Sequence, residues 1–257
     1  MAVYANDWIG INLNVYGVYE RDDLSVIFDF LRPIYSEFAS GVALDVGANV
    51  GNHAIFFDKY FSRTIAFEPN PSTYELLEFN ARHSKAVTAV DCGLGDVAGE
   101  FDLCEDYENF GGSAIKEGAE NGTVRVRVER LDDLGVELTG LRLIKIDVEG
   151  FEANVVRGAK HTIGLYQPII LFEQHRSEFK NGEPETIRVL REMGYDFCWV
   201  RPKKVARTWL VRRLSIVADL LRGGRLDRAI ITASEIPPAT YSMIVGVPKN
   251  RQKVLGL

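Results

Sequence analysis

Short apolar runs alternate with amphipathic stretches along most of the chain. Apolar runs of about four to eight residues are typical of buried strands, and apolar positions three or four residues apart indicate helices. These patterns predict strands at 42–46, 64–67, 86–90, 141–146, 168–172, 195–200 and 241–247, and helices at 22–38, 50–60, 72–82, 149–157 and 184–193. Because strands and helices alternate, we expect an α/β fold with a mostly parallel, doubly wound sheet and helices on both faces.

The alternation is interrupted between residues 97 and 140. Two further strands are predicted there, at 100–103 and 123–128, on either side of a glycine-rich loop at 109–118. Valine alternates with charged residues in the second strand, which indicates one buried and one solvent-exposed face. We expect a short antiparallel excursion from the main sheet.

The helix predicted at 72–82 has a start signal of its own. Ser72 is followed three residues later by Glu75, which is the spacing of a capping box. We therefore expect Ser72 to cap this helix.

Composition indicates a folded protein of the reducing cytoplasm. The 257 residues are 46% hydrophobic and 26% charged, which is enough to bury a large core. The net charge of −6 argues against nucleic acid as a partner. Three widely spaced cysteines give no disulfide framework. Residues 1–10 do not resemble a signal peptide and no apolar run is long enough to span a membrane, so we expect cytoplasmic localisation.

The turn after the first predicted strand carries the first functional signal. Gly47 allows a sharp turn, Asn49 tolerates left-handed backbone, and Gly51 lets the following helix begin close to the strand or to a ligand. Such a turn directs backbone N–H groups toward the edge of the sheet, where they can bind a ligand. An ordinary strand–helix turn is the alternative at this point.

Acidic residues follow almost every parallel strand. They are Asp45, Glu68, Asp91, Asp147 with Glu149, and Glu173 with His175 two residues later. Ligands of open parallel sheets bind beyond these strand ends. Glu68 lies at the end of the strand after the glycine turn, where an acid binds the two hydroxyls of a ribose, so we expect an adenosine-bearing cofactor.

Two adenosine cofactors fit this pattern. NAD places a pyrophosphate over the turn and usually requires a third glycine, which this turn lacks. S-adenosylmethionine (SAM) instead brings an amino group and a positive sulfonium. Because Asp45 would repel a pyrophosphate, electrostatics favours SAM.

Several motifs resemble FkbM-type methyltransferases and occur in the same order. They are DVGANVG at 45–51, FEPNP at 67–71, Asn80, LDDL at 131–134, KIDVEGFE at 145–152, Pro168 and Glu173. The resemblance runs from about residue 42 to 173. It implies a class I methyltransferase fold, a Rossmann-like mixed sheet of seven strands whose last strand is antiparallel. It also implies SAM-dependent O-methylation of a sugar, polyketide or related natural product.

The resemblance assigns residues to the cofactor. Asp45, Gly47, Asn49 and Gly51 belong to the turn that should meet the methionine part of SAM, and Glu68 should meet the ribose. Asn70 and Asp96 are weaker candidates beside the ribose or adenine. The loop that contains Asn109, Gly111 and Gly112 either closes over the site or is a plain surface loop.

Acceptor chemistry is expected where the strands of Asp147 and Glu173 end side by side. A hydroxyl acceptor must lose its proton, so either His175 or a carboxylate acts as a base. Alternatively, Asp147, Glu149 and Glu173 hold a divalent cation that lowers the hydroxyl pKa. We favour the base. His175 as an ordinary surface residue is the alternative.

Lys145 is a further candidate at the same strand end, because it shares a strand face with Asp147. A lysine in a buried strand is unusual. We expect it to pair with Asp147 or Glu149 rather than to react directly.

A basic stretch separates the last two predicted strands. Residues 201–228 hold nine Lys or Arg and two Asp, in a connection far longer than a hairpin requires. Apolar residues at helical spacing predict a basic helical insertion at about 201–240. It could pack on the sheet edge, form a peripheral contact with anionic lipid, or cover a negatively charged acceptor.

These observations predict an N-terminal helical extension at 1–40 and a SAM-dependent methyltransferase domain at 41–257. The expected activity is transfer of a methyl group to a hydroxyl of a sugar or glycosylated natural product, with a small molecule or glycan as acceptor. The alternatives are a non-catalytic SAM-binding or scaffold protein and an NAD-linked oxidoreductase.

Overall fold

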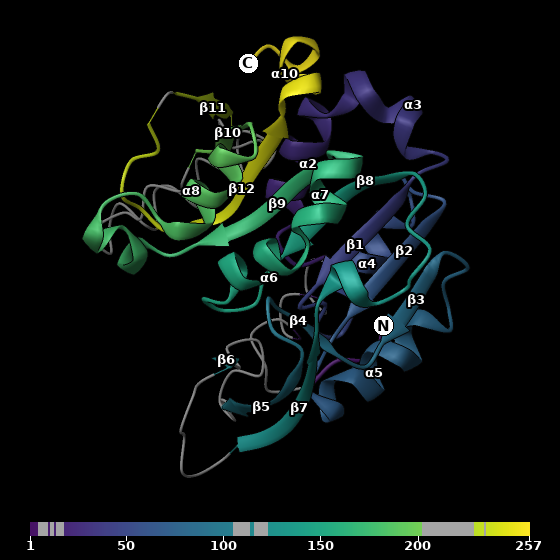
Figure 1. The fold of residues 1–257 in the computed structure, drawn as a ribbon. Helices are drawn as coiled ribbons and strands as arrows, with labels where there is room; N and C mark the ends of the chain where they lie inside the picture. Colours follow the sequence, from purple (N-terminus) through teal and green to yellow (C-terminus); the bar gives the residue numbers. More distant parts are fainter. Residues whose placement is uncertain are drawn as a thin grey trace, which may run out of the picture.

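The computed structural model describes residues 1–4, 10, 13, 18–104, 114–115, 123–201, 229–233 and 235–257 (Figure 1). Its centre is an eight-stranded sheet with the order β11-β10-β12-β9-β8-β1-β2-β3. The strands are β1 (Val42–Val46), β2 (Arg63–Phe67), β3 (Val87–Val90), β8 (Leu141–Ile146), β9 (Ile169–Gln174), β10 (Tyr195–Val200), β11 (Ile230–Thr232) and β12 (Tyr241–Pro248). The five strands from β9 to β3 pair in parallel, and β12 is antiparallel to both neighbours. The predicted α/β fold with an antiparallel last strand is therefore confirmed.

The sheet has one strand more than the seven expected. Residues Ile230–Thr232 pair antiparallel with β10 as strand β11, at the edge of the sheet. The prediction of a helical insertion through to residue 240 is wrong for this segment, because a β-branched Ile-Ile-Thr run completes the edge of β10. Residues 202–228, which hold most of the predicted basic insertion, lie outside the described residues.

Helices cover both faces of the large sheet. One face packs against α6 (Glu152–Gly158), α7 (Lys160–Tyr166) and α8 (Glu185–Glu192). The other packs against α2 (Arg21–Phe30), η1 (Arg32–Ile34), α3 (Tyr35–Phe38), α4 (Asn52–Phe57) and α10 (Lys249–Leu255), and α5 (Pro71–Ala81) lies beside β3. Figure 1 shows these two layers on either side of the strands.

The predicted helix at 22–38 forms with a break. It is divided into α2, η1 and α3, and Pro33 lies at the start of η1. Its apolar face is buried as the pattern predicts, and Phe28 contacts the rings of Phe56 and Tyr60 beside α4. The N-terminal helices therefore share one hydrophobic core with the sheet.

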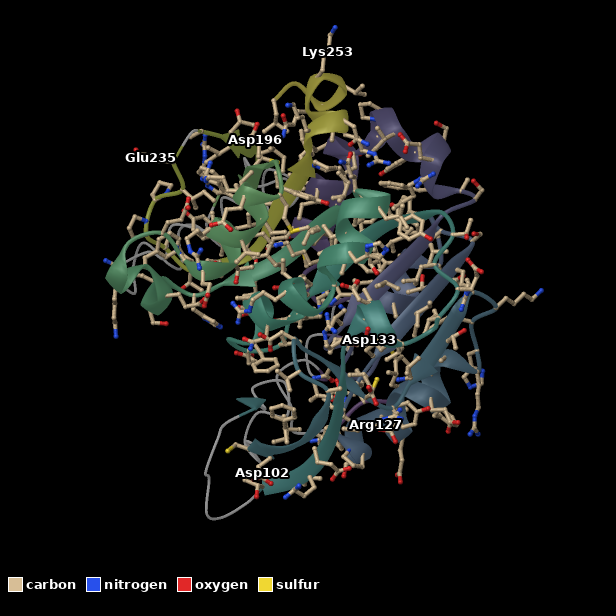
Figure 2. All side chains as sticks on the ribbon, in the orientation of Figure 1. Asp102, Arg127, Asp133, Asp196, Glu235 and Lys253 are labelled. Atoms are coloured by element: carbon tan, nitrogen blue, oxygen red, sulfur yellow. The ribbon has the colours of Figure 1, made fainter. Side chains whose placement is uncertain are left out.

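The interruption between the third and fourth parallel strands is a separate small sheet. It contains β4 (Gly93–Leu94), β5 (Gly99–Cys104), β6 (Ala114–Ile115) and β7 (Thr123–Glu129) in the order β4-β7-β5-β6. Strands β5 and β7 pair antiparallel, as predicted. Asp102 lies at the far edge of this sheet, and Arg127 lies closer to the large one (Figure 2), where it donates a hydrogen bond to the backbone oxygen of Asp91 just after β3 (3.2 Å). The chain returns to β8 through η3 (Leu131–Asp133).

The cap predicted for the helix at 72–82 is wrong by two residues. Asn70 is the N-cap of α5, and its side-chain oxygen accepts hydrogen bonds from the backbone N–H groups of Ser72 (3.0 Å) and Thr73 (3.4 Å). Asn70 takes this position because Pro71, which has no N–H group to satisfy, suits the first turn of the helix. Within the described residues, no helix is long and apolar enough to cross a membrane.

Candidate active site

The turn after β1 contains three residues with left-handed backbone. Gly47, Asn49 and Gly51 have φ values of +74°, +51° and +92°. A side chain at Gly47 would place its Cβ 1.8 Å from the backbone oxygen of Asp147, so this position requires glycine. At Gly51 a Cβ would lie 2.9 Å from Leu77 on α5, so Gly51 allows α4 to pack against α5. The close packing fixes the direction of the backbone N–H groups in the turn.

Glu68 connects this turn to the end of β2. Its carboxylate accepts hydrogen bonds from the backbone N–H groups of Asn49 (2.9 Å) and Asn70 (3.0 Å). Burial raises the pKa of Glu68 to about 7, although these two donors oppose the shift. The predicted acid therefore lies beside the glycine turn.

A cavity lies above these strand ends, with an empty volume of about 870 Å³ that includes its opening to solvent. Backbone and polar side chains from the turn, β8 and α4 form one part of its wall, and apolar residues form another. The lining residues are Tyr19, Val46, Gly47, Ala48, Asn49, Asn52, His53, Glu68, Pro69, Gly93, Leu94, Leu103, Lys145, Asp147, Val148, Glu149 and Phe151. The small sheet contributes Gly93, Leu94 and Leu103, so it forms part of the cavity wall.

Lys145 occupies the centre of the strand ends. Its Nζ lies 3.1 Å from Asp147 and 3.4 Å from Asp45, and it donates a hydrogen bond to the backbone oxygen of Gly47 (3.4 Å). Burial opposes the charge of Lys145, but the two carboxylates raise its pKa above the ordinary value. The predicted pairing with Asp147 is confirmed.

Asp45 lies beneath Lys145 rather than on the cavity wall. Its side chain is fully buried and is not among the lining residues. The carboxylates that line the cavity are Glu68, Asp147 and Glu149. The negative charge that would favour SAM over NAD was expected from Asp45, and it comes instead from these three carboxylates.

Asp147 and Glu173 share a hydrogen bond at the ends of β8 and β9. Burial raises the pKa of Glu173 to about 9, and the neighbouring Asp147 carboxylate adds to the shift. Burial acts on Asp147 in the same direction, but Lys145, the neighbouring His53 and the hydrogen bond with Glu173 together outweigh it and lower the pKa of Asp147 below its ordinary value. At neutral pH, Glu173 therefore carries a proton and Asp147 is ionised.

His175 completes a group at the end of β9. Its Nε2 lies 3.3 Å from Glu149 and 3.8 Å from Glu173. One ligand atom from each of Glu149, Glu173 and His175 lies within 4.8 Å of the other two, close enough to surround a metal ion. Asp147, predicted as part of a metal site, is instead engaged by Lys145.

Residues 45–197 match the family profile described as methyltransferase FkbM domain. The chain belongs to the FkbM methyltransferase family. This confirms the resemblance seen in the sequence motifs.

Two relatives show how far the FkbM match extends. The hexuronic acid methyltransferase AglP of Haloferax volcanii is 27% identical over 154 residues, which cover 58% of this chain and 63% of that protein. Methyltransferase sdnD of Sordaria araneosa is 30% identical over 153 residues, which cover 45% of this chain and 59% of that protein. The chain thus spans about three fifths of the length of these relatives.

A solved structure of a methyltransferase FkbM from Methylobacillus flagellatus also matches. Its sequence is 17% identical to that of this chain over the matched part, and the TM-score is 0.43. The match covers 62% of this chain and 39% of that one.

Two predicted cofactor residues of this FkbM-family chain have other partners. The carboxylate of Asp96 accepts hydrogen bonds from Asn154 (3.0 Å) and Arg157 (2.9 Å), and Asp96 does not line the cavity. The side chain of Asn70 caps α5. The loop with Asn109, Gly111 and Gly112 lies outside the described residues.

Several cavity residues could not be found from the motifs. Tyr19 lies before the family match, and the apolar residues Leu94 and Leu103 come from the small sheet, outside the quoted motifs. Asn52 and His53 directly follow the glycine turn, so their position near it was the one available signal.

Proposed function

We propose that this chain is a SAM-dependent O-methyltransferase that acts on a hydroxyl of a sugar or glycosylated natural product. The observation that supports it best is a single cavity that brings together the residues expected to bind the cofactor and those expected to bind the acceptor. The glycine turn, Glu68, Asp147 and Glu149 line it, and Glu173 and His175 lie behind this lining, in contact with Asp147 and Glu149. The printed name of AglP, a hexuronic acid methyltransferase, supports a sugar acceptor.

The cavity residues fit SAM. Backbone groups of the Gly47–Asn49 turn would hold its amino-acid end, Glu68 its ribose, and the apolar Pro69, Leu94 and Phe151 its adenine. When bound, SAM supplies a methyl group activated by a positive sulfonium. The carboxylates that line the cavity suit a cation and disfavour the pyrophosphate of NAD.

His175 is the best candidate for the base that removes the proton from the acceptor hydroxyl. A neutral imidazole can accept that proton, and Glu149, 3.3 Å from its Nε2, would stabilise the resulting imidazolium. Glu173 is less suited, because its raised pKa keeps it protonated at neutral pH. Asp147, held by Lys145, would orient the acceptor through a hydrogen bond from a hydroxyl.

The same three side chains would offer two carboxylates and one imidazole to a divalent cation. That cation would lower the pKa of a bound hydroxyl. The base mechanism needs no such ion, so the two proposals differ in their response to a chelator.

Methyl transfer from labelled SAM into extracts of the source cells tests the proposed activity. We expect wild-type protein to transfer label to the carbohydrate fraction with or without EDTA. The H175Q substitution should lower the rate by about 10²–10⁴-fold. His161→Gln, on the exposed side of α7, is the matched control and should transfer like wild type.

Three outcomes would contradict parts of the proposal. Loss of transfer in EDTA, restored by a divalent cation, would replace the base by a metal. A protein that binds SAM but transfers no label would be a SAM-binding or scaffold protein. Equal rates for H175Q and H161Q would remove His175 from the chemistry.

A further inference from the structure

Residues 18–20 form a corner that lies against the start of α4. We call Val18, Tyr19 and Glu20 the N-terminal corner. It precedes the family match at 45–197, and Tyr19 nevertheless lines the cavity. The wall of this cavity therefore includes a segment that the family motifs do not contain.

Asn52 holds the corner through two reciprocal hydrogen bonds. The backbone N–H of Tyr19 donates to Asn52 Oδ1 (3.0 Å), and Asn52 Nδ2 donates to the backbone oxygen of Tyr19 (3.2 Å). Asn52 is 5% exposed and directly follows Gly51, the last residue of the glycine turn. The amide thus connects the corner to the turn that would hold the cofactor.

Glu20 and His53 form a second connection. His53 Nε2 lies 3.4 Å from Glu20, and His53 is 4% exposed and lines the cavity. Glu20 has a left-handed φ of +56°, a conformation that is unfavourable in a residue other than glycine. This backbone persists because Asn52 and His53 hold the corner on both sides.

The corner lies near the strand ends where transfer would take place. Tyr19 and His53 line the same cavity as Lys145 and Asp147. Lys145 and Asp147 stand at the carboxyl end of β8, where the acceptor would bind.

We infer that the N-terminal corner closes the transfer end of the cavity and contacts the amino-acid end of bound SAM, with Asn52 and His53 as its positioning residues. This inference rests on the proposed function. Binding at the glycine turn and ordering of the corner are then one event, because Asn52, directly after the turn, holds the corner by two hydrogen bonds. The corner also excludes water from the end of the cavity where the methyl group would be transferred.

Calorimetry with SAM and hydrogen exchange of the peptide covering residues 18–24 test this inference. We expect SAM to slow exchange in this peptide of the wild-type protein. Asn52→Ala removes both hydrogen bonds and should weaken SAM affinity by about tenfold, since a change of 1.4 kcal/mol is a factor of ten. Glu20→Gln, which preserves the shape of the side chain, should weaken affinity about threefold and reduce the protection.

Ser242→Ala is the matched control. It removes the hydrogen bond that Ser242 donates to Asp23 of α2 (3.0 Å), a contact that does not line the cavity, so it tests general loosening of the N-terminal helices. It should bind SAM like wild type. If Asn52→Ala does not fold, Glu20→Gln decides with the same two measurements.

Unchanged SAM affinity and unchanged exchange in the corner variants would overturn the inference while leaving the proposed function intact. Equal weakening by Ser242→Ala would also overturn it, because the effect would then be general. A wild-type protein that does not bind SAM would instead refute the proposed function itself, and this inference with it.

Discussion

Lys145 is buried between two carboxylates that have few other partners. Neither oxygen of Asp45 accepts a hydrogen bond from the described residues, and Lys145 is its nearest cation. Removal of one member of a buried ion pair typically costs about 3–5 kcal/mol, because the remaining charge stays buried. We predict a loss of this size in the free energy of unfolding of Lys145→Met, measured by urea denaturation.

Lys160→Met is the control for the lysine substitution. Lys160 is exposed at the start of α7, and its replacement should change stability by less than about 0.5 kcal/mol. If Lys145→Met is as stable as this control, the ion pairs of Lys145 do not hold the strand ends together. If it is also inactive, Lys145 has a direct role in the chemistry.

Glu173 should make the stability of the protein depend on pH. Its pKa is raised in the folded state, from an ordinary 4.5 to about 9, so its stabilising effect is complete below pH 4.5 and is lost as the pH rises through 9. Between pH 5 and 9, wild type should lose stability relative to Glu173→Gln by up to about 1.4 kcal/mol per pH unit.

Urea denaturation at several pH values measures this difference. Glu235→Gln, an exposed position far from the strand ends, should follow wild type at every pH (Figure 2). Parallel stability curves for wild type and Glu173→Gln would show that Glu173 ionises normally in the folded protein.

Residue types at strand ends predicted one part of the site and missed another. Asp147, Glu173 and His175 do lie together, because parallel strands bring their carboxyl ends to one edge of the sheet. Asp96 was predicted to lie beside the cofactor but does not line the cavity, because it pairs with Arg157, which is distant in the sequence. Tyr19 carries no motif, so its place at the cavity arises from folding alone.

At the scale of elements, the glycine turn makes the sharpest prediction. In Gly47→Ala, the new Cβ would meet the Asp147 backbone oxygen at 1.8 Å, in addition to the strain of a positive φ. We expect a loss of about 2–4 kcal/mol in stability and no SAM binding. Thermal denaturation and calorimetry measure the two effects.

Gly135→Ala is the control that introduces the strain of a positive φ without a steric clash. Gly135 also has a positive φ, +63°, but nothing lies within 4 Å of its Cβ position. This variant should lose about 1–2 kcal/mol and bind SAM normally. An equal loss in both variants would mean that the turn tolerates a side chain.

Strand patterns were more predictable than the ends and edges of elements. The apolar runs gave the bounds of β1, β8 and β10 as observed, because these strands are buried on both faces. Strand β11 was missed because three residues are too few for a periodic signal. The cap of α5 was misassigned because both Asn70 and Ser72 are good capping residues.

The basic segment at 201–228 can be tested as an element. Its three interpretations differ in what replacement of residues 206–228 by a short Gly-Ser linker would do. We expect packing on the sheet edge, so the replacement should lower stability, and the intact protein should not float with anionic vesicles. Flotation of the intact protein that is lost in the shortened one would establish a lipid contact instead.

At the scale of the whole molecule, the site combines segments that are far apart in the chain. The N-terminal corner, the turn after β1, the small sheet and the end of β8 all reach one cavity. The family profile covers the central segments, and the corner lies outside it. The cavity wall therefore includes parts of the chain that the motifs do not describe.

The central claim is that this cavity binds SAM. Isothermal titration calorimetry of the purified protein with SAM, and separately with NAD, tests it most directly. We predict saturable binding of one SAM per chain, abolished by Gly47→Ala and preserved by Gly135→Ala, with no heat of binding for NAD. Binding of NAD without SAM, or of SAM equally well to both glycine variants, would contradict the account.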